Sequence, residues 1–265
     1  MNIPLTRQVA IDACRRMISF HSDLKAIYEK HGMDLFSNRG RRNILMSAPM
    51  ETFLAEELMK TQLYKDVVSD GRTGEPDIKV VCEKDTVEIE CKLTSPHQSS
   101  NSIAFQTDHD TLENKGSLDY IYMIANADFD GFCVIYFKDL TTNEFRGLSP
   151  GARGKVQMFK HKGMKKATVL VGQAISHDQV KIEKITEETR LKLEKKSAQL
   201  ANWRHELETL SATNNHRRKE LNQAILNGLK YVDTTVNNTA DKVRMIRSKD
   251  KSSYSFKFEQ VGNLS

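Results

Sequence analysis

Apolar residues recur at helical spacing in the first part of the chain. Residues 7–31 carry apolar side chains at steps of three and four, with Thr6 available as an N-cap and Gly32 as a stop. We therefore predict an amphipathic helix there. The positions are Val9, Ala13, Met17, Phe20, Leu24 and Ile27. The polar, basic stretch 38–43 predicts a loop, and a second helix is expected to begin near Ser47, with Pro49 in its first turn.

Alternating apolar and charged residues predict a β-hairpin over 77–92. Its first strand is a short apolar run, 83–85 is a polar turn, and the second strand alternates strictly. Side chains two residues apart in a strand share a face. The buried face is expected to hold Val87, Ile89 and Cys91, and the opposite face Glu88, Glu90 and Lys92.

Further strands are predicted from the apolar runs that follow. A polar loop at 94–102 precedes a segment, 103–115, that is able to form a helix. Strands are expected near 119–125, 132–138 and 167–171. Helices and strands in this order predict an α/β (α+β) fold, with a mixed β-sheet flanked by helices.

The pattern changes after about residue 181. Leu193, Leu200 and Leu207 repeat at sevens, with Trp203 and Leu210 on the interleaved positions, which is a heptad seam. The seam breaks at 211–215, and helical spacing resumes over 221–229. An antiparallel helical hairpin, a homodimerising coiled coil and a helix packed on its own domain all fit. The predicted organisation is a core over 1–180, a helical hairpin or coiled-coil arm over 181–235, and a basic tail over 236–265 in which 254–258 is able to close as a strand.

Composition excludes several classes of protein. Only 38% of the 265 residues are hydrophobic, and none of the apolar runs reaches the ~20 residues that a membrane helix needs. Arg7, Asp12, Arg15 and Arg16 interrupt what would be the apolar part of a secretory signal. The four cysteines lack CxxC spacing. Buried, reduced thiols and a cytoplasmic location without a membrane partner are therefore expected.

The net charge of +5 is modest, but the cations are clustered. Clusters of this kind suit a partner lined with phosphates, so we predict DNA binding. The predicted contacts are Arg39, Arg41, Arg42, Arg153, Lys155, Lys160, Lys162, Lys165 and Lys166. A third cluster lies within 242–251. The alternative is that any one of these clusters is an ordinary solvated surface.

The hairpin brings together residue types that suit phosphate hydrolysis. Asp77 and Glu90 offer oxygen ligands for a hard cation such as Mg²⁺. The backbone carbonyl of Cys91 lies between Glu90 and Lys92 and would add a ligand. Lys92, with its charge lowered or shared, would orient a water molecule or stabilise charge on the phosphate. The eight histidines show no zinc-ligand spacing, and no Walker-type or dinucleotide glycine motif is present.

Pro76-Asp77, followed thirteen residues later by Glu90-Cys91-Lys92, resembles the PD-(D/E)xK signature of the nuclease superfamily that includes type II restriction endonucleases. The resemblance covers about 47–137. It implies a restriction-endonuclease-like fold in which Asp77 and Glu90 hold the metal and Lys92 is the catalytic lysine. Glu51, which fits better than Glu56 or Glu57, would be a further acid from the preceding helix. Gln106 corresponds to a glutamine that some members carry.

By this resemblance the chain is expected to be a Mg²⁺-dependent endodeoxyribonuclease, with Mn²⁺ able to substitute. A restriction endonuclease is the leading hypothesis, and a structure-specific or phage-defence nuclease comes next. The alternative from another class is a coiled-coil nucleic-acid-binding protein in which the motif is coincidental or decayed.

Overall fold

The computed structural model describes residues 4–35, 38–69, 72, 75–97, 102–148, 154–248 and 253–262. The chain forms two compact units. The first comprises Met1–Ile175 with Tyr254–Ser265, and the second comprises Ser176–Ser253. Within the described ranges, none of the helices is both long enough and apolar enough to span a membrane.

A seven-stranded mixed sheet forms the centre of the first unit, in the order β1-β2-β3-β5-β6-β11, with β8 also paired to β6. The strands are β1 (Asp66–Ser69), β2 (Ile78–Val81), β3 (Thr86–Thr94), β5 (Leu118–Ala125), β6 (Gly131–Leu140), β8 (Ala167–Val171) and β11 (Glu259–Gln260). Only β3 and β5 pair in parallel, and the other pairs in this sheet are antiparallel. The predicted mixed sheet flanked by helices is thereby confirmed.

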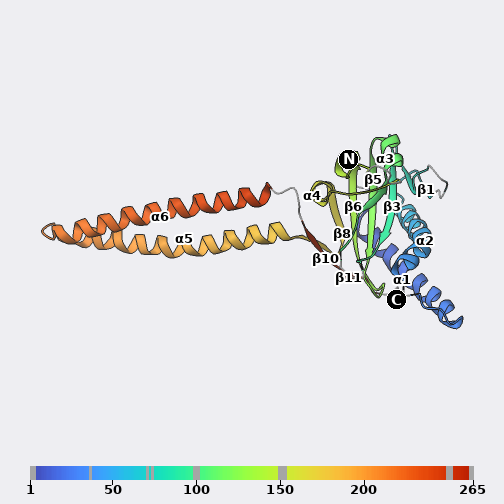
Figure 1. Cartoon of the computed structure of the whole chain (residues 1–265), viewed down its shortest axis with the longest axis horizontal. Helices are drawn as coiled ribbons and strands as arrows, with labels where there is room; N and C mark the ends of the chain where they lie inside the picture. The colour runs from blue at the N-terminus through green and yellow to red at the C-terminus, as the bar shows by residue number, and fades with distance from the viewer. Residues whose placement is uncertain are drawn as a thin grey trace. The chain divides into compact units, whose positions relative to one another are not determined.

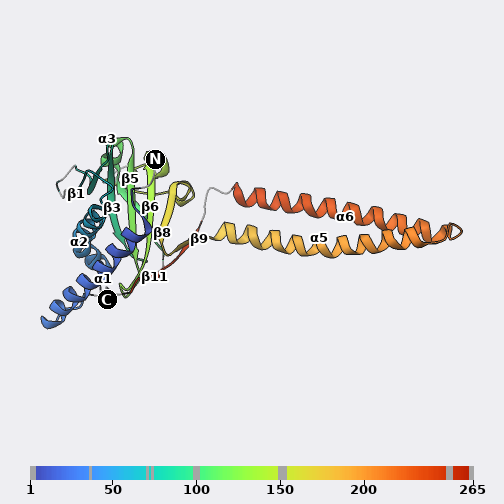
Figure 2. The ribbon, with the colours of Figure 1, turned by 180° about the vertical axis from the view of Figure 1, so that it is seen from behind.

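Helices α1 (Arg7–Lys30) and α2 (Arg39–Lys60) cover one face of the sheet. They lie side by side, with α2 packed on β3 and α1 near β8 (Figures 1 and 2). In β5, Ile121 and Met123 face these helices, whereas Tyr120 and Tyr122 belong to the core of the opposite face. The two-residue repeat of a strand therefore builds two cores from one segment.

The opposite face is covered by short elements. They are β4 (Gln106–Asp108), α3 (His109–Lys115), the 3-10 helix η1 (Thr142–Glu144), β7 (Lys155–Gln157), α4 (Lys160–Gly163) and the 3-10 helix η2 (Met164–Lys166). β4 pairs with β7 in a separate two-stranded sheet. Phe105 stands at the middle of this core and meets the rings of Tyr122, Phe137 and Phe256 edge-on. The expected helix over 103–115 is thus helical only in its second half.

The start of α2 differs from the prediction. The stretch 38–43 is not a loop, because α2 begins at Arg39 with the Asn38 side chain accepting a hydrogen bond from the Arg41 amide. Pro49 consequently lies inside the helix rather than in its first turn. The buried stripe Arg42, Met46, Met50, Leu54 and Leu58 repeats every four residues. The first buried position is an arginine rather than an apolar residue, so the hydrophobic pattern did not predict the first two turns of α2.

The second unit is an antiparallel pair of helices, α5 (His177–Thr209) and α6 (Asn215–Arg247), each of 33 residues and about 50 Å long (Figure 1). The range 236–247, expected as part of a basic tail, is therefore helix. The predicted strand near 254–258 is confirmed as β10 (Tyr254–Lys257), which pairs with β9 (Gln173–Ser176). The His177 amide donates to the Ser253 carbonyl at 3.0 Å, so the two ends of this hairpin meet.

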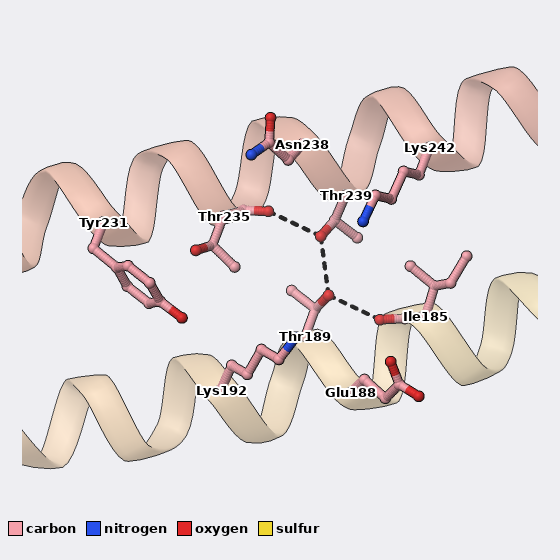
Figure 3. Close-up of a pocket in the computed structure, with 9 residues that line it drawn as sticks. All are labelled: Ile185, Glu188, Thr189, Lys192, Tyr231, Thr235, Asn238, Thr239 and Lys242. Atoms are coloured by element: carbon pink, nitrogen blue, oxygen red, sulfur yellow. Dashed lines mark hydrogen bonds between the residues drawn. The ribbon is translucent and has the colours of Figure 1, made fainter.

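The seam between α5 and α6 alternates apolar and polar layers. Leu200 and Leu221 are buried, and a Cβ added to Gly228 would stand 2.6 Å from the Leu200 side chain, so glycine permits this close packing. Farther along, the Thr189 and Thr239 hydroxyls bond to each other at 2.9 Å beside an open gap of about 220 Å³ (Figure 3). α6 therefore covers the predicted heptad seam within the same chain.

Candidate active site at the edge of β3

The candidate site lies where β2 and β3 part. The last antiparallel partner of β2 on β3 is Ile89, opposite Ile78. Beyond this pair, the Asp77 side chain takes the place of a strand neighbour, because its Oδ2 accepts a hydrogen bond from the Cys91 amide at 2.7 Å. The Asp77 carboxylate is thus fixed beside β3 by the Cys91 amide, which would bond to a backbone carbonyl if β2 extended this far.

Lys92 joins the two acids of the motif. Its Nζ lies 2.7 Å from Glu90 Oε2 and 3.8 Å from Asp77 Oδ2. Glu90 is 9% exposed, whereas Lys92 remains half-buried. The expectation that Glu90 and Lys92 share a face is confirmed by their direct contact, and Asp77 lies on the same side of the hairpin.

Glu51 reaches the same cluster from α2. Burial raises the pKa of its carboxyl to about 7, with the charges of Asp77 and Glu90 adding to the effect and Lys92 opposing it. Because the charges of Asp77, Glu90 and Lys92 all affect the pKa of Glu51, its carboxyl lies in the neighbourhood of the motif residues. Glu56 and Glu57, the alternatives on this helix, pair with Arg16 at 2.5 and 3.1 Å, so they serve the packing of α1 on α2.

The electrostatics of the cluster favour a bound cation. Burial and the Asp77 charge raise the pKa of Glu90 in spite of Lys92. Burial alone would lower the pKa of Lys92, but Glu90 and Asp77 bring it above its ordinary value, so the lysine is charged rather than neutralised. Two carboxylates crowd one ammonium group, and their charges also act on the Glu51 carboxyl. A divalent cation with oxygen preference would relieve this crowding, so the residues present fit Mg²⁺.

Tyr120 is a neighbour of the site that the motif did not indicate. It stands opposite Glu90 in the parallel β3–β5 register, and its hydroxyl contacts the Thr107 hydroxyl at 2.8 Å. Burial raises the pKa of Tyr120 to about 12, and the Glu90 charge contributes. Its only signal in the sequence is a tyrosine in an apolar strand. By contrast, Glu88 is an ordinary ion-pair member, since it meets Lys115 at 2.8 Å.

The predicted arginine cluster divides into three different environments. Arg42 is 0% exposed and donates to the Ala127 carbonyl at 2.6 Å and the Ser95 hydroxyl at 2.9 Å. The prediction that it contacts DNA is therefore wrong, because these buried bonds tie α2 to the end of β3. Arg41 is exposed, and Arg39 is half-buried with a bond to the Pro96 carbonyl at 3.0 Å.

The lysines of the second basic segment are also only partly available. Lys162 and Lys166 donate to backbone carbonyls, and Lys166 also pairs with Glu144 at 3.1 Å. Lys160 stands 5.9 Å from the Phe105 ring centroid, and burial lowers its pKa. Lys155 and Lys165 are exposed, whereas Arg153 lies outside the described residues. This segment is thus not a continuous stripe of solvated cations.

A cavity of about 420 Å³ opens at the far end of β3, between that strand and the first turn of α2. Its lining comprises Asn38, Arg39, Gly40, Asn43, Thr94, Ser95, Pro96, His97, Ala104 and Gln106. Gln106, which the motif resemblance had singled out, therefore shares this cavity with His97. Ser95, which also lines the cavity, accepts a hydrogen bond from Arg42.

A second group of candidate metal ligands lies on α3. Ligand atoms of His109, Asp110 and Glu113 all fall within 4.8 Å of one another, with both acids exposed. Sequence reasoning missed this group because it searched for histidine–histidine and cysteine–histidine spacings. The four-residue step from His109 to Glu113 is the signal that could have found it.

Comparisons of the chain with family models, curated proteins and solved structures find no match.

Proposed function

We propose that the protein is a Mg²⁺-dependent endonuclease that hydrolyses phosphodiester bonds of DNA, and that it is of the restriction type. The observation that carries the proposal is the convergence of Asp77, Glu90 and Lys92, joined by Glu51, at the open edge of β3. The motif supports the class of reaction, and its family resemblance favours restriction.

In this proposal the carboxylates of Asp77 and Glu90 hold the metal, together with the Cys91 carbonyl, and Glu51 shapes a second metal or water position. When bound, Mg²⁺ would supply positive charge to the phosphate and increase the acidity of water. Lys92 is held by Glu90 and Asp77, so its ammonium group is preorganised to donate a hydrogen bond to the attacking water or to a phosphate oxygen. Mn²⁺, which accepts the same oxygen ligands, would substitute.

The cations that support a DNA substrate are fewer than the sequence suggested. Arg41, Lys155 and Lys165 are exposed, and Arg39 lines the cavity at the end of β3. Each phosphate neutralised by such a group releases counterions, so binding would weaken as salt rises.

The test is cleavage of supercoiled plasmid and linear DNA with Mg²⁺ or EDTA, using wild type, Asp77→Ala and Lys92→Ala. We expect the wild type to cleave DNA with Mg²⁺ and not with EDTA. Neither variant should cleave DNA under either condition. If the protein binds DNA but cleaves none of the substrates with any cation, the non-enzymatic alternative is favoured. Cleavage that survives both substitutions would place the chemistry elsewhere.

We also infer that a second copy of the chain covers the outer surface of α6. Leu226, Leu229 and Val236 are exposed there. Among the described residues of the hairpin, only Leu200, Leu221 and Gly228 are buried. Light scattering of the full chain should give a dimer, and Leu226→Glu with Leu229→Glu should give a monomer, while Gln223→Glu, on the same helix, should not. A monomeric wild type at working concentration would contradict this inference.

A further inference from the structure

The cavity at the end of β3 lies on the catalytic strand itself. Thr94, which lines it, follows Lys92 by two residues and so projects from the same face of β3. Two residues of strand span about 7 Å, whereas successive stacked nucleotides of one strand rise by about 3.4 Å. A group bound in the cavity would therefore be one or two nucleotides from a phosphate held at Lys92.

The lining of the cavity suits the parts of a single nucleotide. Arg39 uses one of its five N–H groups on the Pro96 carbonyl, and a guanidinium group is a strong ligand for phosphate. Gln106 is exposed at the cavity and offers an amide donor and acceptor, which is the pair that recognises a base edge. Ala104, which is half-buried in the lining, supplies apolar surface for the face of a base.

The concave form of the site indicates how a base would reach it. Side chains that read an intact duplex project from a helix or ribbon into a groove. A cavity of about 420 Å³ has the size of a small-ligand site and admits only a group that has left the stack. We propose that this cavity is a subsite for the unstacked nucleotide adjacent to the scissile phosphate, with Arg39 on its phosphate and Gln106 on its base. This inference rests on the proposed nuclease function.

The experiment first locates the scissile phosphate from sequenced cleavage ends of the wild type. Duplexes are then made with 2-aminopurine immediately 5′ or 3′ of that phosphate, and protein is added in EDTA so that the strand stays intact. Fluorescence of 2-aminopurine rises when the base leaves the stack. We expect a severalfold rise at one of the two positions with the wild type, and less than half of that rise with saturating Arg39→Ala or Gln106→Ala.

Gln157→Ala is the matched control, because Gln157 stands opposite Gln106 in the β4–β7 pair but does not line the cavity. It should keep the full rise. Arg39→Ala should also weaken binding about tenfold, the effect of one lost charged hydrogen bond, and Arg39→Lys replaces it if the alanine variant does not fold. If the wild type cleaves DNA without a rise in 2-aminopurine fluorescence, or if both variants show the same rise as the wild type, the subsite is wrong but the nuclease function stands. A wild type that cleaves nothing would overturn both.

Discussion

Glu90 and Asp119 are buried carboxyl groups on neighbouring parallel strands, and their surroundings differ. Asp119 Oδ1 accepts from the Asp139 amide at 2.7 Å, and Oδ2 accepts from the Tyr136 hydroxyl. Both oxygens of Asp119 thus have neutral donors. Glu90 has a lysine as its donor at 2.7 Å, and that lysine also faces Asp77.

The difference separates an acid that serves the fold from one that suits chemistry. Burial raises the pKa of both carboxyls, so the direction of the shift does not distinguish them. What distinguishes them is the kind of hydrogen-bond donor that each carboxylate has. Asp119 is satisfied by neutral groups within the sheet, as expected of a structural buried acid. Glu90 shares the Lys92 ammonium group with Asp77, and the charges of all three act on Glu51. This arrangement costs stability and favours a functional role.

The largest expected effect follows from replacing the Glu90 carboxylate by an amide. Glu90→Gln should lower the cleavage rate about a thousandfold, because an electrostatic group at a reacting centre is lost, while the melting temperature stays the same or rises. The rate is measured at fixed Mg²⁺ and the melt by circular dichroism. Glu88→Gln, in β3 and paired with Lys115, controls for the loss of a carboxylate from the hairpin and should change the rate by no more than about twofold. Full activity of Glu90→Gln would contradict the assignment.

The alternation of Val87, Ile89 and Cys91 was sufficient to predict which face Glu90 and Lys92 share, because strand geometry fixes that relation locally. The side on which Asp77 lies could not be derived in this way. It depends on β2 beginning only at Ile78, which leaves Asp77 just before the strand with its carboxylate bonded to the Cys91 amide. Glu51 was placed by motif resemblance alone, since a helix and a strand meet through tertiary packing.

For the basic residues the sequence-based prediction was less successful. A cluster of cations in the sequence does not reveal which of them is buried. Arg42 enters the core because its guanidinium bonds to Ala127, Asn126 and Ser95, all distant in the chain. The short strands β1 and β11 were likewise unpredicted, because two to four residues give too little alternation to detect.

The second prediction concerns the acid that serves the fold. Tyr136→Phe removes one donor from the buried Asp119 carboxylate, so the free energy of unfolding should fall by about 1–3 kcal/mol. The loss should be larger at pH 7 than at pH 4, because only the charged carboxylate needs the donor fully. Denaturant titration at the two pH values measures it. The cleavage rate per folded molecule should stay within about twofold of the wild type. A large loss of rate without loss of stability would mean that this cluster also takes part in the chemistry.

The smallest expected effect is a gain in stability from Glu51→Gln. The folded chain keeps a proton on Glu51 up to about pH 7, whereas an ordinary glutamate releases it near 4.5. The stabilising contribution is therefore complete below pH 4.5 and is lost as pH rises through 7. Glutamine cannot ionise and does not suffer this loss. Above pH 7 in EDTA, the variant should be more stable than the wild type by on the order of 1 kcal/mol, because Glu51 is only half-buried. The two should be equally stable at pH 4.

Mg²⁺ provides the control, because a cation held by the cluster stabilises the folded state by mass action. Saturating Mg²⁺ should raise the melting temperature of the wild type more than that of Glu51→Gln and so reduce or reverse the gap seen in EDTA. Glu56→Gln is the matched variant, since Glu56 lies on the same helix as Glu51 but pairs with Arg16 of α1. It should show neither the pH-dependent gain nor the altered response to Mg²⁺. If the stabilities of wild type and Glu51→Gln change in parallel across pH 4–8, Glu51 is not part of the cluster. The comparison with Asp119 would then rest on Asp77 and Glu90 alone.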